Sequence, residues 1–337
     1  MTGLELARRF FAEAVEPLVA SVAPDLRFSA GLLGDGSDVL GYDDDVSRDH
    51  GWGPRCQLLL DRERRPETVT ALDDAFTTRL PLRFLGYPTS YAGYHLDPIA
   101  APPIRHWIDM ATPEEFLRNE LGVADARGLS PRDWVALRSH KLAGVVGGEL
   151  FRDDLDFAAT RRVLAAYPDD VRLYFIAAEW MKIADEQAFP ARAGSVGDES
   201  GSAIVAARLA EGLMRIGFHL MRTYAPYGKW FGSAFARLAR CTALAKALAR
   251  MLTARGWQER DRAWAQALAA ALALHEEEGL VARERYVLAP VYIGRPGTGL
   301  PQFERGGPPS IMTLIDEIRG RIADPEIRAL AQALEPA

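Results

Sequence analysis

The chain has 337 residues, a formal net charge of −6 at pH 7, 48% hydrophobic residues and 26% charged residues. This length is sufficient for two domains with sizeable cores, and the composition excludes a disordered chain. The acidic balance argues against a broad nucleic-acid-binding surface, so nucleic acid is not an expected partner.

Cysteine content and apolar runs bear on the compartment. Cys56 and Cys241 are the only cysteines, which provides no disulfide framework and suits a reducing environment. The apolar stretch over residues 4–22 is interrupted by charged side chains, and no apolar run approaches the twenty residues that a membrane helix needs. We therefore expect a cytoplasmic location and no membrane partner.

The first 130 residues predict a mixture of helix and strand. Residues 3–22 have the spacing of an amphipathic helix, and short apolar runs separated by polar or Pro/Gly-rich connections predict strands at 26–33, 56–61, 81–85 and 104–110. Thr112 with Pro113 and Glu115 is typical of a helix start with a capping box.

The pattern becomes helical from Ser130, which can cap a helix whose first residue is Pro131. We expect it to stay helical, with a loop at 189–200, a Pro/Gly-rich stretch at 290–309, and helices at 157–166, 169–187, 201–223, 230–255, 259–278 and 311–333. The prediction is an α+β fold, with a mixed-sheet domain over residues 1–130 and an α-helical bundle over 131–337. A ligand site in the cleft between two such domains is expected, because pockets gather at domain interfaces.

A glycine-rich turn follows the first predicted strand. Gly36 and Ser37 supply a flexible backbone and a hydroxyl, which can cradle phosphate oxygens. The third glycine of a dinucleotide fingerprint and the Gly-Lys-Ser/Thr of a P-loop are both missing, so neither motif applies. On its own the turn could equally be an ordinary strand connection.

The spacing after this turn resembles the nucleotidyltransferase superfamily. Eleven residues separate Ser37 from Asp49, and the superfamily pattern is Gly-Ser, a spacer of about this length, and two acids alternating along a strand. Residues i and i+2 of a strand face the same side, so two such carboxylates can bind Mg²⁺ together. The resemblance implies a third acid on a neighbouring strand, for which Asp109 is the candidate; Asp109 could equally be an acid at the edge of a strand.

A closer resemblance is to the bacterial domain-of-unknown-function 4037 family of nucleotidyltransferase-like proteins, over almost the whole chain. The family hallmark reads Gly-Ser, Val-Leu-Gly-Tyr-Asp, then Asp-His-Asp-Trp-Gly-Pro-Arg, which residues 36–43 and 49–55 match closely. Further similar segments are Gly147–Asp153, Tyr167–Val171, Val196–Ser202 and Tyr224–Trp230. The resemblance implies a nucleotidyltransferase-like N-terminal domain, Mg²⁺, and ATP or another nucleoside triphosphate as substrate.

The chain departs from the family at three motifs. Gly51 replaces the second acid of Asp-His-Asp, which leaves Asp49 as the only metal-binding acid of that pair. His275 is followed by Glu276 where asparagine is expected, and Gly297 follows Arg-Pro where an apolar residue is expected. The acids at 43–45 could compensate for Gly51 or simply form a solvated loop.

The candidate site residues follow from these matches. Catalytic and metal-binding roles are assigned to Asp49 and Asp109. Nucleotide-binding roles are assigned to Gly36, Ser37, Arg48, Arg55, Arg192, Asp198, Tyr224 and Lys229. Lys229 could neutralise a triphosphate or be a solvated lysine at a helix start. Arg192 and Asp198 could bind a ligand or form an internal salt bridge.

Two main functions fit the sequence. The first is a Mg²⁺-dependent transferase that moves a nucleotidyl group onto the hydroxyl or amine of an unidentified small-molecule acceptor. The second is a catalytically inactive nucleotide- or metabolite-binding protein, which the replacement at Gly51 favours. A biosynthetic enzyme with diverged chemistry is a third, and the oligomeric state is not defined by the sequence.

Overall fold

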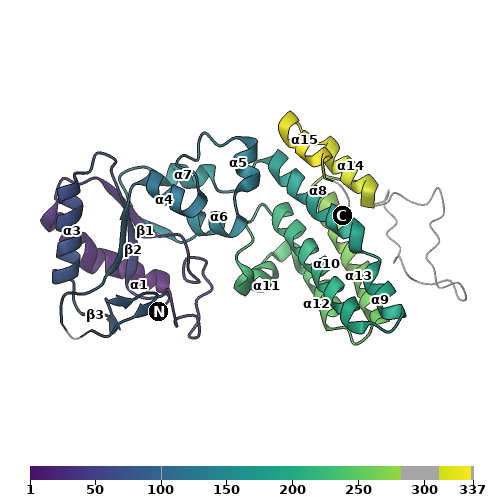
Figure 1. The fold of residues 1–337 in the computed structure, drawn as a ribbon, viewed down its shortest axis with the longest axis horizontal. Helices are drawn as coiled ribbons and strands as arrows, with labels where there is room; N and C mark the ends of the chain where they lie inside the picture. The colour runs from purple at the N-terminus through teal and green to yellow at the C-terminus, as the bar shows by residue number, and fades with distance from the viewer. Residues whose placement is uncertain (100, 282–310, 335–337) are drawn as a thin grey trace, which may run out of the picture. The chain divides into compact units, whose positions relative to one another are not determined.

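The computed structural model describes residues 1–99, 101–281 and 311–334 (Figure 1). It has a mixed α/β fold with a four-stranded mixed sheet and many helices. This agrees with the combination of a mixed sheet and helices that the sequence predicted. The chain divides into two compact units. Unit 1 consists of residues 1–130 and 136–165, and unit 2 consists of residues 131–135 and 166–337.

Unit 1 contains the sheet, whose strand order is β7-β2-β1-β8. The strands are β1 (Phe28–Leu32), β2 (Arg55–Leu60), β7 (Trp107–Ala111) and β8 (Glu149–Asp153). β1 pairs antiparallel with both β2 and β8, whereas β2 pairs parallel with β7. The predicted strands at 26–33, 56–61 and 104–110 are therefore confirmed apart from their ends.

Short strands and helices complete unit 1. Two hairpins are formed by β3 (Arg83–Phe84) with β4 (Tyr87–Pro88) and by β5 (Tyr91–Ala92) with β6 (His95–Leu96). The helices are α1 (Gly3–Phe10), α2 (Glu16–Val22), α3 (Pro66–Arg79), α4 (Pro113–Leu121), α6 (Ser139–Val146) and α7 (Phe157–Val163). A π-helical turn, Phe11–Val15, joins α1 to α2, so the predicted helix over 3–22 is confirmed. The capping box of Thr112 and Glu115 is also present.

The core of unit 1 lies between the N-terminal helices and the sheet. Helix α1 passes alongside β1 and β2 (Figure 1). Leu6 and Phe10 recur at four-residue spacing and are fully buried, together with Phe28, Leu58 and Leu60 from the strands. Burying one such side chain contributes about 1.5–3 kcal/mol, so this apolar face fixes the helix on the sheet.

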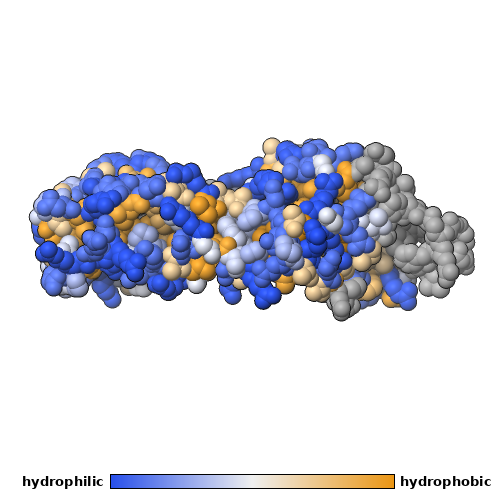
Figure 2. All heavy atoms as spheres, turned by 90° about the horizontal axis from the view of Figure 1, so that it is seen from above, coloured by the Kyte–Doolittle hydropathy of each residue, from blue (hydrophilic) through white to orange (hydrophobic). Residues whose placement is uncertain are grey.

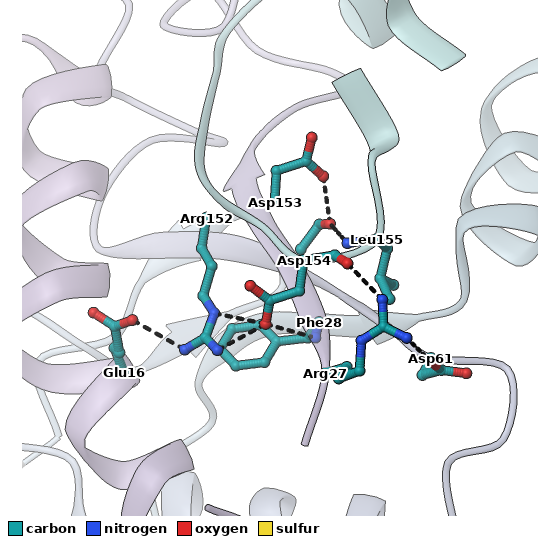
Figure 3. Close-up of polar contacts among 9 residues, drawn as sticks. Glu16, Arg27, Phe28, Asp61, Arg152, Asp153, Asp154 and Leu155 are labelled. Atoms are coloured by element: carbon teal, nitrogen blue, oxygen red, sulfur yellow. Dashed lines mark hydrogen bonds and ion pairs between the residues drawn. The ribbon is translucent and has the colours of Figure 1, made fainter. Parts of the chain in front are cut away.

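Strand β8 corrects the prediction that the chain stays helical after residue 130. Figure 3 shows its end, where Arg152 Nη2 donates to Asp154 Oδ2 (2.7 Å). Ser29 Oγ of β1 donates to Asp153 Oδ1 (2.6 Å). Its five residues include three charged ones, so it lacks an apolar strand signature. Pairing with the buried strand β1 satisfies its backbone groups and overrides the local preference.

In unit 2 the described elements are helical, and α5 (Pro131–Ala136) begins in it. Its other helices are α8 (Asp169–Glu186), α9 (Phe189–Ser195), α10 (Glu199–Leu220), α11 (Gly228–Ala236), α12 (Thr242–Thr253), α13 (Trp257–Glu277), α14 (Ile311–Gly320) and α15 (Pro325–Gln332), with a 3₁₀ turn at Ala239–Cys241. Helix α10 packs against α8, α9, α12 and α13.

Three predictions in unit 2 were wrong in detail. The expected loop at 189–200 contains α9, and the expected helix at 230–255 is divided into α11 and α12. The expected helix at 311–333 is divided before Pro325, which has no N–H to continue a helix and begins α15 after the Asp324 cap. The stretch at 290–309, including Gly297, lies outside the described residues.

The distribution of hydrophobic residues bears on the membrane prediction. On the face drawn in Figure 2, hydrophilic residues predominate, with hydrophobic residues in patches between them. Within residues 1–99, 101–281 and 311–334, no helix combines the length and the apolar character needed to cross a bilayer.

Candidate functional site

The glycine turn lies between β1 and β2 and is held by backbone hydrogen bonds. Tyr42 N donates to Ser37 O (2.8 Å), and Gly34 N donates to Gly144 O of helix α6 (3.0 Å). A Cβ atom at Gly144 would lie 2.4 Å from Gly34 O, so only glycine allows this close approach of helix and turn. Gly36 and Ser37 remain partly exposed at the surface of the turn.

A buried ion pair between Arg55 and Asp38 contacts the backbone of the turn. Arg55 Nη2 donates to Asp38 Oδ1 (2.7 Å) and to Asp35 O (3.2 Å), and the side chains of Arg55 and Asp38 are only 3% and 1% exposed. A Cβ atom at Gly36 would lie 2.5 Å from Arg55 Nη2, and its φ of +148° also suits glycine. The predicted nucleotide-binding residue Arg55 is therefore already bound to a carboxylate.

The protonation of this pair is set by burial. Burial raises the pKa of the Asp38 carboxyl, and the adjacent Arg55 guanidinium opposes that rise. In the described part of the chain, Asp38 Oδ2 and Arg55 Nε are buried without a hydrogen-bond partner. We expect the ionised pair to persist at neutral pH, because two opposite charges in hydrogen-bond contact stabilise each other strongly at low dielectric.

Lys141 on α6 is a cation at the turn that the sequence analysis missed. Its Nζ lies 2.8 Å from Asp35 Oδ2 and 3.1 Å from Glu120 Oε2, and its side chain is 27% exposed. Burial lowers its pKa, but hydrogen bonds to both carboxylates outweigh burial and raise the pKa overall. A lysine near the start of a helix 106 residues away in sequence gives no local signal of this contact.

Asp109 lies on β7, where it is paired in register with Gln57 of β2. Gln57 Oε1 accepts a hydrogen bond from Leu33 N (2.8 Å), which orients this side chain. The surrounding groups desolvate the Asp109 carboxyl and raise its pKa, although the side chain keeps an exposed surface; Arg55 opposes the rise. The structure therefore brings Asp109 and Arg55 onto neighbouring strands.

Asp49 does not lie on a strand, contrary to the motif-based prediction. β2 begins only at Arg55, and Asp49 lies in an exposed turn where its Oδ1 contacts His50 Nδ1 (2.8 Å). The turn is fixed to the β5–β6 hairpin, because Gly51 N donates to Tyr94 O (2.8 Å) and His95 Nδ1 contacts Asp49 O (2.8 Å). Trp52, Gly53 and Pro54 follow as an irregular segment before pairing begins.

These positions bear on the Mg²⁺ prediction. Two acids alternating along one strand would bind a metal from one face of the sheet. On the face that carries Asp109, the alternating residues of β2 are Arg55 and Gln57, and neither is an acid. Within the described ranges, no group of three or more His, Cys, Asp and Glu side chains is arranged to hold a metal ion. The residues present do not fit a complete carboxylate-bound metal centre of the kind that the resemblance implies.

Arg48 stabilises the same turn. Its guanidinium lies 4.9 Å from the centre of the Trp52 ring, its Nη2 donates to Met1 O (3.0 Å), and its Nη1 lies 3.1 Å from Asp45 Oδ1. The side chain is 31% exposed. These contacts describe a residue that orders the loop around Trp52.

The four candidates in unit 2 are not all brought together. Asp198 Oδ1 accepts from Gly201 N (2.7 Å) as the cap of α10, and Arg192 is exposed on α9 before it. Tyr224 and Lys229 follow the other end of α10, whose 22 residues span roughly 33 Å. One small ligand cannot contact both ends of such a helix.

Tyr224 and Lys229 have different surroundings. Tyr224 is buried with its ring 5.0 Å from the Tyr167 ring, and burial raises its pKa. Lys229 is exposed at the start of α11, with Nζ 5.1 Å from the centre of the Trp230 ring. Tyr224 is therefore part of a packed aromatic cluster, whereas Lys229 is accessible.

His275 is a structural residue. Trp180 Nε1 donates to His275 Nε2 (3.0 Å), and His275 Nδ1 lies 2.8 Å from Ala271 O, which fits the neutral tautomer with the proton on Nδ1. Complete burial lowers its pKa to about 4.

Comparisons with known proteins match only the middle of the chain. Residues 134–231 match the family model "Domain of unknown function (DUF4037)", which supports the family resemblance seen in the sequence. No curated protein and no solved structure matches the chain. The matched segment includes α6, β8 and the start of α11, and it contains Lys141, Tyr224 and Lys229.

Proposed function

We propose that this chain binds a nucleoside triphosphate, or a metabolite with a similar phosphate chain, at the glycine turn, and that binding rather than nucleotidyl transfer is its principal activity. The partly exposed Gly36 and Ser37 would face the phosphate, and Lys141 would supply positive charge. A phosphate oxygen would replace Asp35 as the partner of the lysine.

The register of β2 and β7 favours phosphate binding over nucleotidyl transfer. Asp109 is opposite Gln57, and the β2 residue before Gln57 on the same face is Arg55, which is occupied by its buried bond to Asp38. An amide and a paired guanidinium cannot supply the negative charge that binds Mg²⁺ between an enzyme and a triphosphate. Binding needs only the turn and a cation, and both are present.

A specific contact favours the second candidate, the Mg²⁺-dependent nucleotidyltransferase. The turn that holds Asp49 is bonded to the β5–β6 hairpin, and the rings of Tyr91 and Tyr94 lie 4.8 and 5.4 Å from the Trp107 ring. Trp107 precedes Asp109 by two residues, so the hairpin connects the segments that hold the two predicted acids. In that candidate Asp49 and Asp109 would hold Mg²⁺, whose charge would neutralise the triphosphate.

Calorimetric titration with a non-hydrolysable ATP analogue, with and without Mg²⁺, tests the proposal. We expect saturable binding whose affinity changes less than about threefold with Mg²⁺ and falls at least tenfold in Lys141→Gln. Lys182→Gln is the matched control, because Lys182 also pairs with a carboxylate, Glu179, but lies in unit 2. Absence of binding to any triphosphate would overturn the proposal.

Three further variants and one control separate the candidates. If binding requires Mg²⁺ and is lost in both Asp49→Asn and Asp109→Asn, the transferase is the better account. Gly51→Asp restores the missing acid, and we expect it to make binding Mg²⁺-dependent. Gly86→Asp is its control: both glycines have left-handed φ values, +63° and +87°, and neither added Cβ would meet an atom within 4 Å.

A further inference from the structure

Arg172, near the start of α8, is a buried cation with unused hydrogen-bonding capacity. Its side chain is 6% exposed, and its Nε lies 3.3 Å from Asp169 Oδ1. Its Nη1 is fully buried and has no hydrogen-bond partner among the residues that the structure describes. A buried donor without a partner is costly, so Arg172 Nη1 has a hydrogen bond left to donate to a bound group.

Among the described residues, Arg172 shares the one carboxylate that it contacts directly with a second arginine. Arg222 Nη1 donates to the same oxygen, Asp169 Oδ1, so two guanidinium groups share one carboxylate. Asp169 is itself 62% exposed, which weakens its compensation of the buried charge. The two guanidinium groups therefore have one carboxylate in direct contact between them, while Glu278 attracts Arg172 without a direct contact.

A small cavity adjoins these arginines. It is lined by Tyr167, Arg172, His219, Arg222, Thr223 and Tyr224, and its volume of about 10 Å³ corresponds to about one water molecule. His219 is stacked on Phe175 with the ring centres 5.2 Å apart, and burial lowers its pKa to about 3, so it is neutral there. The described lining residues therefore combine guanidinium and hydroxyl groups with aromatic rings, and none of them carries a carboxylate.

The backbone holds Arg222 and Thr223 at the cavity. Arg222 has a left-handed φ of +51°, and Arg222 N and Thr223 N donate to His219 O (3.1 Å) and Phe218 O (3.0 Å) at the end of α10. This closing turn brings the chain from α10 back to the start of α8. All six lining residues lie within the segment 134–231 that matches the family model.

We propose that this cavity is an oxyanion site, in which one oxygen of a phosphate or carboxylate group accepts a hydrogen bond from Arg172 Nη1. Guanidinium groups bind both kinds of oxyanion with strong charge-assisted hydrogen bonds. The size of the cavity admits one oxygen, so the rest of the ligand lies outside it, beside Arg222, which is 47% exposed. The proposal is independent of nucleotide binding in unit 1.

Calorimetric titration of the full chain with inorganic phosphate and with acetate, at low ionic strength, tests the site. We expect saturable binding that weakens at least tenfold in Arg172→Gln and in Arg222→Gln. The second variant changes an exposed side chain, so it keeps the test decisive if Arg172→Gln fails to fold. Tighter binding of phosphate than acetate would identify a phosphorylated ligand, and the reverse order a carboxylate.

Two controls exclude other sources of binding. Arg208 lies on α10, the helix of His219, and forms an exposed ion pair with Glu186. Arg208→Gln should bind both anions with the affinity of the unchanged chain. A loss of anion affinity in Lys141→Gln with none in Arg172→Gln would place the anion at the glycine turn and overturn the proposal. Absence of binding to both anions would mean that the cavity holds water only, which would also overturn it.

Discussion

The two units each bury an arginine, but they compensate its charge differently. In unit 1, Arg55 is bonded to Asp38, and both side chains are almost fully buried. In unit 2, Arg172 shares an exposed carboxylate with Arg222 and lines a small cavity. Arg55 therefore contacts a buried carboxylate that no other arginine is seen to bind, whereas Arg172 contacts an exposed carboxylate that it shares with Arg222.

The difference indicates which arginine is available to a ligand. A buried pair of opposite charges needs no further ion, and its main consequence is that neither partner can be removed alone. A buried cation with a shared, solvated partner keeps attraction for an additional anion. Sequence resemblance selected Arg55 as a nucleotide-binding residue, but on physical grounds Arg172 is the better candidate for direct contact with an anion.

The largest effect is expected for Asp38→Asn, which leaves the Arg55 charge buried without a counter-charge. We expect it to destabilise unit 1 by about 3–5 kcal/mol. Asp169→Asn removes the corresponding partner in unit 2, and because Asp169 is 62% exposed we expect a loss of no more than about 1 kcal/mol. Hydrogen exchange followed by mass spectrometry measures the two units separately.

The control for this comparison removes both charges. The double variant Asp38→Leu with Arg55→Met should recover most of the stability lost in Asp38→Asn, because an apolar pair leaves no uncompensated charge. Equal losses of stability in Asp38→Asn and Asp169→Asn would contradict the distinction between the buried Asp38 carboxylate and the exposed, shared Asp169 carboxylate.

A smaller effect is expected from pH, through His275 in unit 2. An unfolded histidine binds a proton near pH 6.5, but the folded His275 does so only near pH 4. Between these values the unfolded state binds more protons, so stability falls as the pH is lowered from about 6.5 toward 4. At pH 5 the loss is on the order of 2 kcal/mol.

His275→Gln isolates this contribution, since a glutamine does not titrate. Hydrogen exchange of α8 and α13, measured at pH 7 and pH 5 and corrected for the intrinsic rates, should show a smaller pH-dependent loss in the variant. An unchanged pH dependence would mean that protonation of His275 does not destabilise unit 2.

Local sequence patterns predicted the strands and helices that are apolar and regular. β1 and β2 are continuous buried runs, and α8 and α13 have apolar residues at helical spacing, so these elements were found nearly to their ends. β8 was missed because its stability comes from pairing with β1, a contact over more than a hundred residues. Long-range pairing of this kind has no local signature.

Contacts in the candidate site could be predicted only where both contacting residues belong to one sequence motif. The glycine turn and Arg55 belong to one continuous motif, and the structure places them in contact. Lys141 and Arg172 reach their positions through helix packing, so spacing could not connect them to a site. Asp198 lay in a polar segment between two helical patterns, where a helix cap and a ligand-binding acid have the same local sequence.

The smallest effect is expected at Asp198, and it distinguishes these two roles. As the cap of α10, Asp198 accepts a hydrogen bond from Gly201 N (2.7 Å), so Asp198→Ala should destabilise the helix by about 1 kcal/mol. Asp198→Asn keeps a good cap and removes the charge, so it should retain nearly all of the stability. Hydrogen exchange in the first turns of α10 measures both variants. Phosphate affinity should remain unchanged in each, since the Arg172 cavity adjoins the opposite end of this helix; a weaker affinity in Asp198→Asn would show that the charge, and not the cap, is what the chain requires there.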